Sequence, residues 1–144
     1  MALSTITVRY NTNTTLPSPN AGDLPIVVAD IAIDPADGNT YPVGGEPLDF
    51  GIAGLNLFRE VHACIPTLLE QPTPGVGGTT SLSVLWERDT APAGINSGHL
   101  RFYQAPGVLA PLIELVGGTL YSTLFSDLAF LTVLVVGRPF TDAS

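Results

Sequence analysis

The residues of this chain that are capable of nucleophilic or metal chemistry are few, and their spacing favours neither. The chain has two histidines and one cysteine, and no Gly-x-Ser-x-Gly segment presents a serine as a nucleophile. His62-Ala63-Cys64 would place a histidine and a cysteine on the same side of a strand. A structural zinc site takes four ligands, however, and the chain has no second cysteine. We therefore interpret His62 and Cys64 as packing residues and expect no metal there.

Carboxylates near position 34 raise the question of a calcium site. Asp34 does not begin an EF-hand loop, because Ala36, Gly38 and Gly45 stand where oxygen ligands would be needed. We favour solvated turn carboxylates for Asp34 and Asp37. An irregular calcium site near these two residues remains the alternative.

A second group of candidates surrounds the single tryptophan. Glu87 and Asp89 share one side of a strand beside Trp86, as the carboxylate pair of a glycosidase would, but sandwich edges carry such pairs routinely. Trp86, Phe102 and Tyr103 would form a platform for a sugar ring if they shared a surface, although aromatic residues in adjacent strands more often belong to a core. We predict that the protein is not an enzyme and uses no cofactor.

Composition narrows the class of protein further. The 144 residues are about one domain's worth of sequence, and charged residues make up 12% against about 25% in an ordinary domain. Lysine is absent, and five arginines face 13 carboxylates, for a net charge of −8. Nucleic acids and anionic membrane surfaces require clustered cations, so neither is an expected partner. An apolar chain with so few charges suggests that other protein covers much of its surface.

The same features indicate a compartment. One cysteine cannot form a disulfide within the chain, and the first residues have neither the basic nor the apolar region of a secretory signal. The longest apolar run, residues 128–136, has half the length of a membrane helix. We expect synthesis and folding in a cytoplasm.

Glycine and proline are scattered along the chain, 15 and 13 residues respectively, which leaves little room for helices. Alternation and β-branched content predict about eight strands, at 6–10, 25–33, 48–62, 81–87, 98–104, 109–115, 119–124 and 128–136. This spacing predicts an all-β fold, a jelly-roll-like antiparallel β-sandwich. We assign the sandwich to residues 23–138, an N-terminal strand and extended arm to 1–22 and a C-terminal tail to 139–144.

Two strand pairings follow from turn chemistry and alternation. Asp37-Gly38-Asn39 predicts a hairpin that joins 26–33 to 40–43. Residues 81–87 should pair with 98–104 across the loop 88–97. Alternation gives this second hairpin a core face and a face that can be polar; the core face takes Leu82, Val84, Trp86, Leu100 and Phe102, and the polar face takes His99, Arg101 and Tyr103.

The last predicted strand, 128–136, is apolar on both sides. Such a strand is either central in a sandwich whose outer face is covered or packed against a partner subunit. Both alternatives stay open at this point.

Two features of the sequence resemble a family of viral proteins. Residues 40–49 (TYPVGGEPLD) look like the Tyr-Pro-x-Gly-Gly-x-Pro-Leu turn of small virion structural proteins of tailed bacteriophages. The order of a Trp-bearing strand, the strand GHLRFYQ, the segment 110–115 and a closing apolar strand that ends at Gly137 is similar to the layout of the same group. Residues 122–127 depart from the more polar turn of that layout. The resemblance covers about residues 38–138 and is to the head decoration, or cement, proteins.

The resemblance implies a β-sandwich that attaches as a homodimer or homotrimer to the outside of the major capsid lattice, stabilises the head and has no catalytic residues. The expected location is the outer surface of the virion, and the expected partners are the major capsid protein and the chain itself. The alternative is a carbohydrate- or receptor-binding β-sandwich module of a virion surface. We expect contacts from the N-terminal arm, the turn 41–47 and the loop 88–97; the candidate interface residues are Tyr10, Tyr41, Gly44, Gly45, Pro47, Arg88, Asp89, Arg101 and Tyr103.

Overall fold

A computed structural model describes residues 3–11, 26–36, 38–51, 55, 57–69, 81–90, 95–105 and 109–138. Its elements are β1 (Leu3–Asn11), β2 (Ile26–Ile33), β3 (Glu46–Asp49), β4 (Glu60–Leu68), β5 (Leu82–Arg88), β6 (Ser97–Gln104), β7 (Ile113–Glu114), the 3-10 turn η2 (Tyr121–Thr123) and β8 (Ala129–Arg138). The strands form two antiparallel sheets, one in the order β1-β2-β8-β4 and the other in the order β3-β6-β5 with β7 beside β6.

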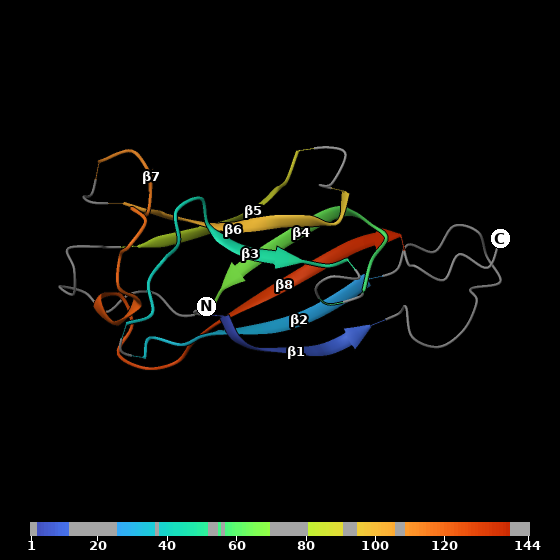
Figure 1. The fold of residues 1–144 in the computed structure, drawn as a ribbon, viewed down its shortest axis with the longest axis horizontal. Helices are drawn as coiled ribbons and strands as arrows, with labels where there is room; N and C mark the ends of the chain where they lie inside the picture. Colours follow the sequence, from blue (N-terminus) through green and yellow to red (C-terminus); the bar gives the residue numbers. More distant parts are fainter. Residues whose placement is uncertain are drawn as a thin grey trace.

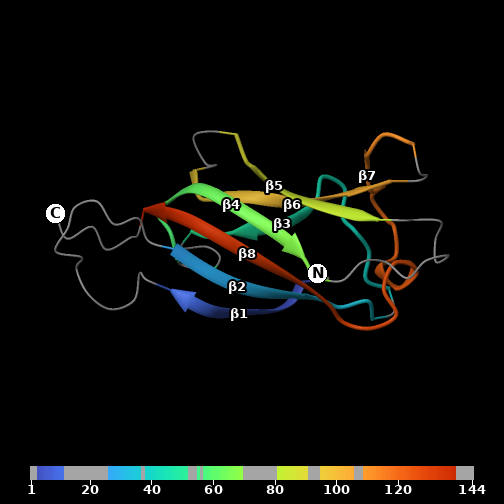
Figure 2. The same ribbon diagram turned by 180° about the vertical axis from the view of Figure 1, so that it is seen from behind.

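The two sheets lie face to face as the layers of a sandwich (Figures 1 and 2). From β2 to β5 the chain alternates between the sheets, and the early strands β2 and β3 pair with the late strands β8 and β6. This exchange of early and late strands gives the jelly-roll-like arrangement. The predicted all-β sandwich of about eight strands is therefore confirmed.

Strand β8 occupies the middle of its sheet, between β2 and β4 (Figure 1). Its register with β2 runs from Ile33 opposite Ala129 to Ile26 opposite Val136. Because side chains alternate along a strand, one set from each strand faces the other sheet. That inward set is fully or almost fully buried and consists of Val27, Ala29, Ile31, Ile33, Ala129, Leu131, Val133 and Val135.

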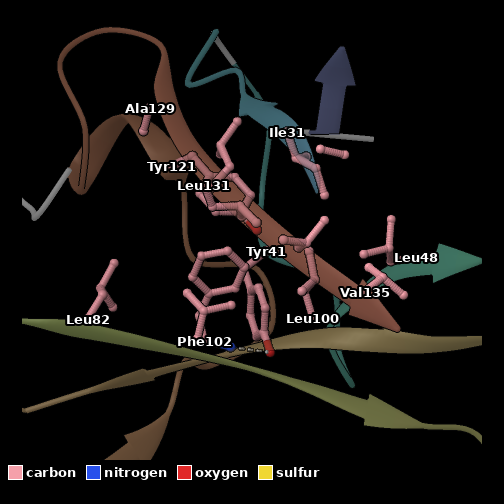
Figure 3. Close-up of a cluster of buried hydrophobic side chains, with 14 of the residues drawn as sticks. Ile31, Tyr41, Leu48, Leu82, Leu100, Phe102, Tyr121, Ala129, Leu131 and Val135 are labelled. Carbon is pink, nitrogen blue, oxygen red and sulfur yellow. Dashed lines mark hydrogen bonds between the residues drawn. The ribbon is translucent and has the colours of Figure 1, made fainter. Parts of the chain in front are cut away.

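Aromatic rings fill the space between the two sheets (Figure 3). The ring of Phe102 lies edge-on to that of Tyr41 at a centroid distance of 5.8 Å and to that of Tyr121 at 6.2 Å. Phe50 makes a similar contact with Trp86 at 5.8 Å. Edge-to-face pairs of this kind add stability beyond the area that they bury.

The pairing of β5 with β6 agrees with the predicted hairpin, from Leu82 opposite Gln104 to Arg88 opposite Gly98. Its core face is buried at Leu82, Val84, Leu100 and Phe102, with Trp86 packed against the core. The opposite face carries His99, Arg101 and Tyr103, as alternation predicted.

The other predicted hairpin is wrong. The turn forms, with a hydrogen bond from the Asn39 amide to the Ala36 carbonyl at 3.0 Å and a φ of 89° at Gly38, while Asp37 lies outside the described residues. Strand β2 already pairs with β1 on one side and β8 on the other. The chain therefore continues past β2, and Thr40 pairs with Leu120 instead.

Three predicted strands also differ from the structure. Residues 48–62 contribute to two strands in different sheets, because the chain reverses where the Phe50 carbonyl accepts hydrogen bonds from the amides of Leu57 and Phe58. The segment 119–124 contains the 3-10 turn η2 instead of a strand, and the buried Tyr121 anchors this turn. Only Ile113–Glu114 of the segment 109–115 is a strand. In the first two segments, contacts with distant residues override the local strand pattern, from Phe50 to Asn96 and from Tyr121 to Asn39.

Only part of the predicted N-terminal arm and none of the predicted C-terminal tail belongs to the described residues. Strand β1 pairs with β2 and forms one edge of the β1-β2-β8-β4 sheet. The rest of the predicted arm, 12–22, and the predicted tail, 139–144, lie outside the described residues.

Candidate interaction surfaces

The outer face of the β3-β6-β5 sheet is polar and is organised around Arg101. The guanidinium Nη1 of Arg101 lies 2.9 Å from Oε2 of Glu114, and its Nε pairs with the carboxylate of Glu87. These groups meet because Arg101 is an outward position of β6, flanked by β5 on one side and β7 on the other. One cation therefore joins carboxylates from both neighbouring strands.

The ion pairs of this face are connected to the core through Tyr41. The Tyr41 hydroxyl donates to Oε1 of Glu114 at 2.9 Å and accepts from the Phe102 amide at 3.4 Å. Burial, together with the hydrogen bond to Glu114, raises the pKa of Tyr41 above its usual value. Tyr41, a predicted interface residue, is fully buried, so its side chain supports the surface from below instead of contacting a partner.

Beside this cluster lies an open hollow of about 420 Å³. Its lining comes from the turn after Tyr41, from the end of β5 and from β6; it consists of Val43, Gly44, Glu87, Arg88, Asp89, Thr90, His99 and Arg101. Four predicted interface residues, Gly44, Arg88, Asp89 and Arg101, thus come together here. The predicted contact elements 41–47 and 88–97 meet at this hollow, although residues 91–94 lie outside the described part of the chain.

Charges around the hollow are largely paired. Asp89 Oδ1 lies 2.9 Å from Nδ1 of His99, and Nη2 of Arg88 donates to the Val61 carbonyl at 2.7 Å. The Arg88 bond links β5 to β4 in the other sheet. Glu87 and Asp89, the candidate carboxylate pair, therefore each have a basic neighbour, Arg101 for Glu87 and His99 for Asp89.

The turn that borders the hollow depends on its glycines. The Gly45 amide donates to the Pro42 carbonyl at 3.1 Å, and φ is 84° at Gly44 and 100° at Gly45. Residues other than glycine rarely adopt such positive φ angles. A Cβ at Gly45 would also stand 2.8 Å from the Leu100 carbonyl oxygen. The turn lifts Val43 into solvent, where 91% of its surface is exposed.

The remaining predicted interface residues fall in several places. Pro47 is exposed on β3, opposite His99, and the half-buried Tyr103 is on the outer face of β6. Gly45 is buried beneath the turn. Tyr10 belongs to β1 in the other sheet, opposite Val28, and its side chain lies outside the described residues. The nine predicted residues therefore do not form a single site.

The candidate sugar platform is not assembled in this fold. Trp86 and Phe102 point into the core, and the indole nitrogen of Trp86 donates to the Leu48 carbonyl at 3.4 Å. Tyr103 lies on the opposite face of the sheet. This agrees with the favoured interpretation of Trp86 and Phe102 as core residues, and Tyr103 is separated from them because neighbouring residues in a strand point to opposite faces.

A β-bulge separates His62 and Cys64, the two residues of the candidate metal site. The register of β4 against β8 shifts between Val61 and Ala63, which directs Cys64 toward the core, opposite Val135. Burial raises the pKa of the Cys64 thiol to about 12. His62 is exposed instead, 4.0 Å from Glu60, so the two residues do not share a side as alternation had predicted.

The carboxylate of Asp34 is used within its own turn, where Oδ1 accepts from the Ala36 amide at 2.8 Å. This agrees with the favoured interpretation of Asp34 as a turn residue. Within the described part of the chain, no three His, Cys, Asp or Glu side chains gather closely enough to hold a metal ion.

The outer face of the β1-β2-β8-β4 sheet is largely apolar, and none of its described side chains was among the predicted contacts. Ile65 of β4 stands opposite Leu134 of β8, which in turn stands opposite Val28 of β2. Phe130 and Leu134 are exposed, as is Ile65. Strand β8 is thus central, and its outward apolar side chains remain accessible. The available signal was the two-sided apolar pattern of 128–136, but the second half of β4 was not predicted as a strand.

Comparison with known proteins found no matching family model, no similar curated protein and no similar solved structure. Among the described residues, no helix has the length and apolar character needed to cross a membrane.

Proposed function

We propose that this protein is a capsid decoration protein, which binds the outside of an assembled major capsid lattice and stabilises the head. The observation that carries the proposal is the contrast between the two outer faces of the sandwich, one built of paired charges and the other of exposed apolar side chains. A small domain with two unlike surfaces is suited to hold two kinds of neighbour, a shell subunit and another copy of itself. The resemblance of residues 38–138 to head decoration proteins supports the same conclusion.

The surface that we assign to the shell is the hollow and the turn beside it. This surface offers an exposed apolar tip at Val43 and ion pairs held in fixed positions, so it combines burial with directional polar contacts. Hydrogen bonds hold this surface in place, from the Gly45 amide to the Pro42 carbonyl and from Tyr41 to Glu114. A surface that is ordered before binding loses less entropy on docking. Each contact is small, and a symmetric oligomer multiplies it through avidity.

Binding to shells is the direct test of this function. Expanded shells assembled from the major capsid protein of the same genome are mixed with the purified chain and sedimented, and the bound fraction is quantified. We expect saturable binding with a copy number that follows the symmetry of the lattice. Absence of binding at saturating protein would overturn the proposal.

A matched pair of variants locates the contact. Val43→Asp places a carboxylate at the tip of the turn, and Leu109→Asp does the same at another loop residue, whose side chain is 98% exposed. Desolvating a carboxylate in an apolar contact is costly, so Val43→Asp should weaken binding to shells by about tenfold or more. Leu109→Asp should bind as the unchanged chain does. Equal binding by both variants would exclude the turn as the contact.

A further inference from the structure

The outer face of the β1-β2-β8-β4 sheet has the composition of a buried surface. In its described strands, outward positions at both ends of the face are apolar and include Ile26, Val28, Ala63, Ile65, Phe130, Leu134 and Val136. Between them a polar row crosses the sheet, from Thr7 through Asp30 and Thr132 to Thr67. The Thr132 hydroxyl donates to Asp30 at 2.6 Å, which holds this carboxylate within the face.

We propose that a second copy of this chain packs on this face, so that two four-stranded sheets stack about a two-fold axis. The inference rests on the homo-oligomeric part of the proposed function and does not depend on the shell as a partner. It names the interface and selects the dimer from the two oligomers that the sequence left open.

The area of the face suits this occupant. Strands are spaced about 4.8 Å apart and rise about 3.3 Å per residue, so the four-stranded face covers about 500 Å². Two such faces together would bury about 1,000 Å², which is where specific interfaces begin. Stacked sheets also pack closely without further adaptation, since the side chains of two inner faces interdigitate at a separation of about 10 Å.

The distribution of charge selects this face over the opposite one. A chain of net charge −8 repels its own copies wherever carboxylates are dense. The outer face of the other sheet carries Glu87 and Glu114 around a single arginine, Arg101. Among the described outward positions from Ile26 to Ala32 of β2, from Phe130 to Val136 of β8 and from Ala63 to Thr67 of β4, Asp30 is the one charged side chain. At the end of this face Arg138 and Glu60 stand opposite each other, with Nη1 and Oε2 4.0 Å apart, so their charges offset. Of the two outer faces, the described side chains of β2, β8 and β4 therefore offer two copies less repulsion and more apolar surface.

Symmetry gives the proposal a definite stoichiometry. When one surface packs on an identical surface, the contact is isologous and closes after two copies. A trimer needs two different surfaces on each copy instead. The stacked-sheet contact therefore predicts a particle of twice the 15.0 kDa chain mass.

The test uses sedimentation velocity of the full chain over a wide range of concentration, with two variants matched in exposure. Ile65 on the apolar face is 56% exposed, and Leu85 on the polar face is 57% exposed. Ile65→Glu should raise the dissociation constant of the dimer on the order of 100-fold, because a carboxylate would lose its hydration inside the contact. Leu85→Glu should leave the dimer intact. A monomer or a trimer of the unchanged chain, or dissociation by Leu85→Glu alone, would overturn the proposal.

Two controls keep the result interpretable. Thermal unfolding of Ile65→Glu at a concentration where both proteins are monomeric should match the unchanged chain, and Phe130→Gln serves as a second, milder variant if it does not. Sedimentation with shells is read separately: a monomeric Ile65→Glu chain that still binds shells supports the dimer interface and leaves the proposed function standing. A dimer that ignores shells would instead sink the proposed function and retain the interface.

Discussion

The two outer faces of this sandwich differ in polarity, although each belongs to a sheet whose inner face is apolar. On β5 and β6 the side chains alternate between core and solvent, and the outward positions carry Glu87, Arg101 and their neighbours. On β8 the side chains also alternate between core and solvent, but apolar residues occupy both sets, since Phe130 and Leu134 face outward while Leu131 and Val133 face inward. Folding of one domain requires a single apolar face from each sheet. The additional apolar face therefore goes beyond what the folding of the isolated chain requires, and it is the face on which we propose that a second copy packs.

The faces also differ in how firmly they are attached to the core. The polar face is joined to the interior through hydrogen bonds from Glu114 to Tyr41 and from Tyr41 to the Phe102 backbone. The apolar face depends on the packing of β8 between β2 and β4, and its described polar row is held by the bond between Thr132 and Asp30. A rigid polar surface favours specific recognition, whereas an apolar surface provides affinity through area.

The largest effect on stability should come from removing the Phe102 ring, which lies in the core between the two sheets. Phe102 is fully buried and contacts the rings of Tyr41 and Tyr121, so Phe102→Ala should lower the free energy of unfolding by about 3–5 kcal/mol. Urea denaturation measures this change. Leu85→Ala, on the outer face of the neighbouring strand, should stay within about 0.5 kcal/mol of the unchanged chain. Similar losses in both variants would contradict the assignment of inner and outer faces.

A smaller effect should follow from cutting the link between the core and the polar face. Tyr41→Phe removes the donor to Glu114 and the acceptor for the Phe102 amide, and we expect a loss of about 1–2 kcal/mol in the same measurement. Tyr103→Phe is the matched control, because Tyr103 is half-buried on the outer face, and it should change stability by less than about 0.5 kcal/mol. If Tyr41→Phe proved as mild as this control, the polar face would not depend on the link.

What the sequence predicted well was local. Alternation in 81–87 and 98–104 assigned the two faces of that hairpin correctly, because period-two patterning depends on neighbours along one strand. The two-sided pattern of 128–136 left two alternatives, and the structure shows a central β8 whose outward side chains Phe130 and Leu134 are exposed. The resemblance to head decoration proteins brought Gly44 and Arg88 into the candidate set, and the structure places both at one hollow.

What it missed depends on contacts between distant segments. The division of 48–62 requires Phe50 to bond with Leu57, Phe58 and Asn96, and no periodicity reveals such a reversal. The bulge at His62 moves Cys64 to the core side and Ile65 to the outside, so the apolar face extends over residues that were assigned to no strand. A one-residue shift of register reverses every side chain beyond it, which is why local patterns failed here.

The inward and outward carboxylates of the β3-β6-β5 sheet provide the finest comparison. Glu46 and Glu87 both belong to this sheet, but Glu46 faces the core and is almost fully buried, with Oε1 accepting from the Tyr121 hydroxyl at 2.9 Å. Burial raises the pKa of Glu46 above its usual 4.5, and the hydrogen bond from Tyr121 opposes part of this rise. Glu87 instead remains at the surface beside Arg101.

The raised pKa of Glu46 predicts a stability that falls as pH rises. Below pH 4.5 the carboxyl group is protonated in both folded and unfolded chains, so its contribution is fully retained. Above that value the unfolded chain releases the proton first, and stability declines until the folded pKa is passed.

Glu46→Gln keeps an acceptor for Tyr121 and cannot ionise, so its urea midpoint should match that of the unchanged chain in acid and exceed it increasingly toward neutral pH. Tyr121→Phe should extend the decline to higher pH and enlarge it, because it removes the hydrogen bond that favours the charged carboxylate. Parallel pH profiles for all three proteins would show that Glu46 is not the group responsible, and that the inward carboxylate behaves no differently from an outward one.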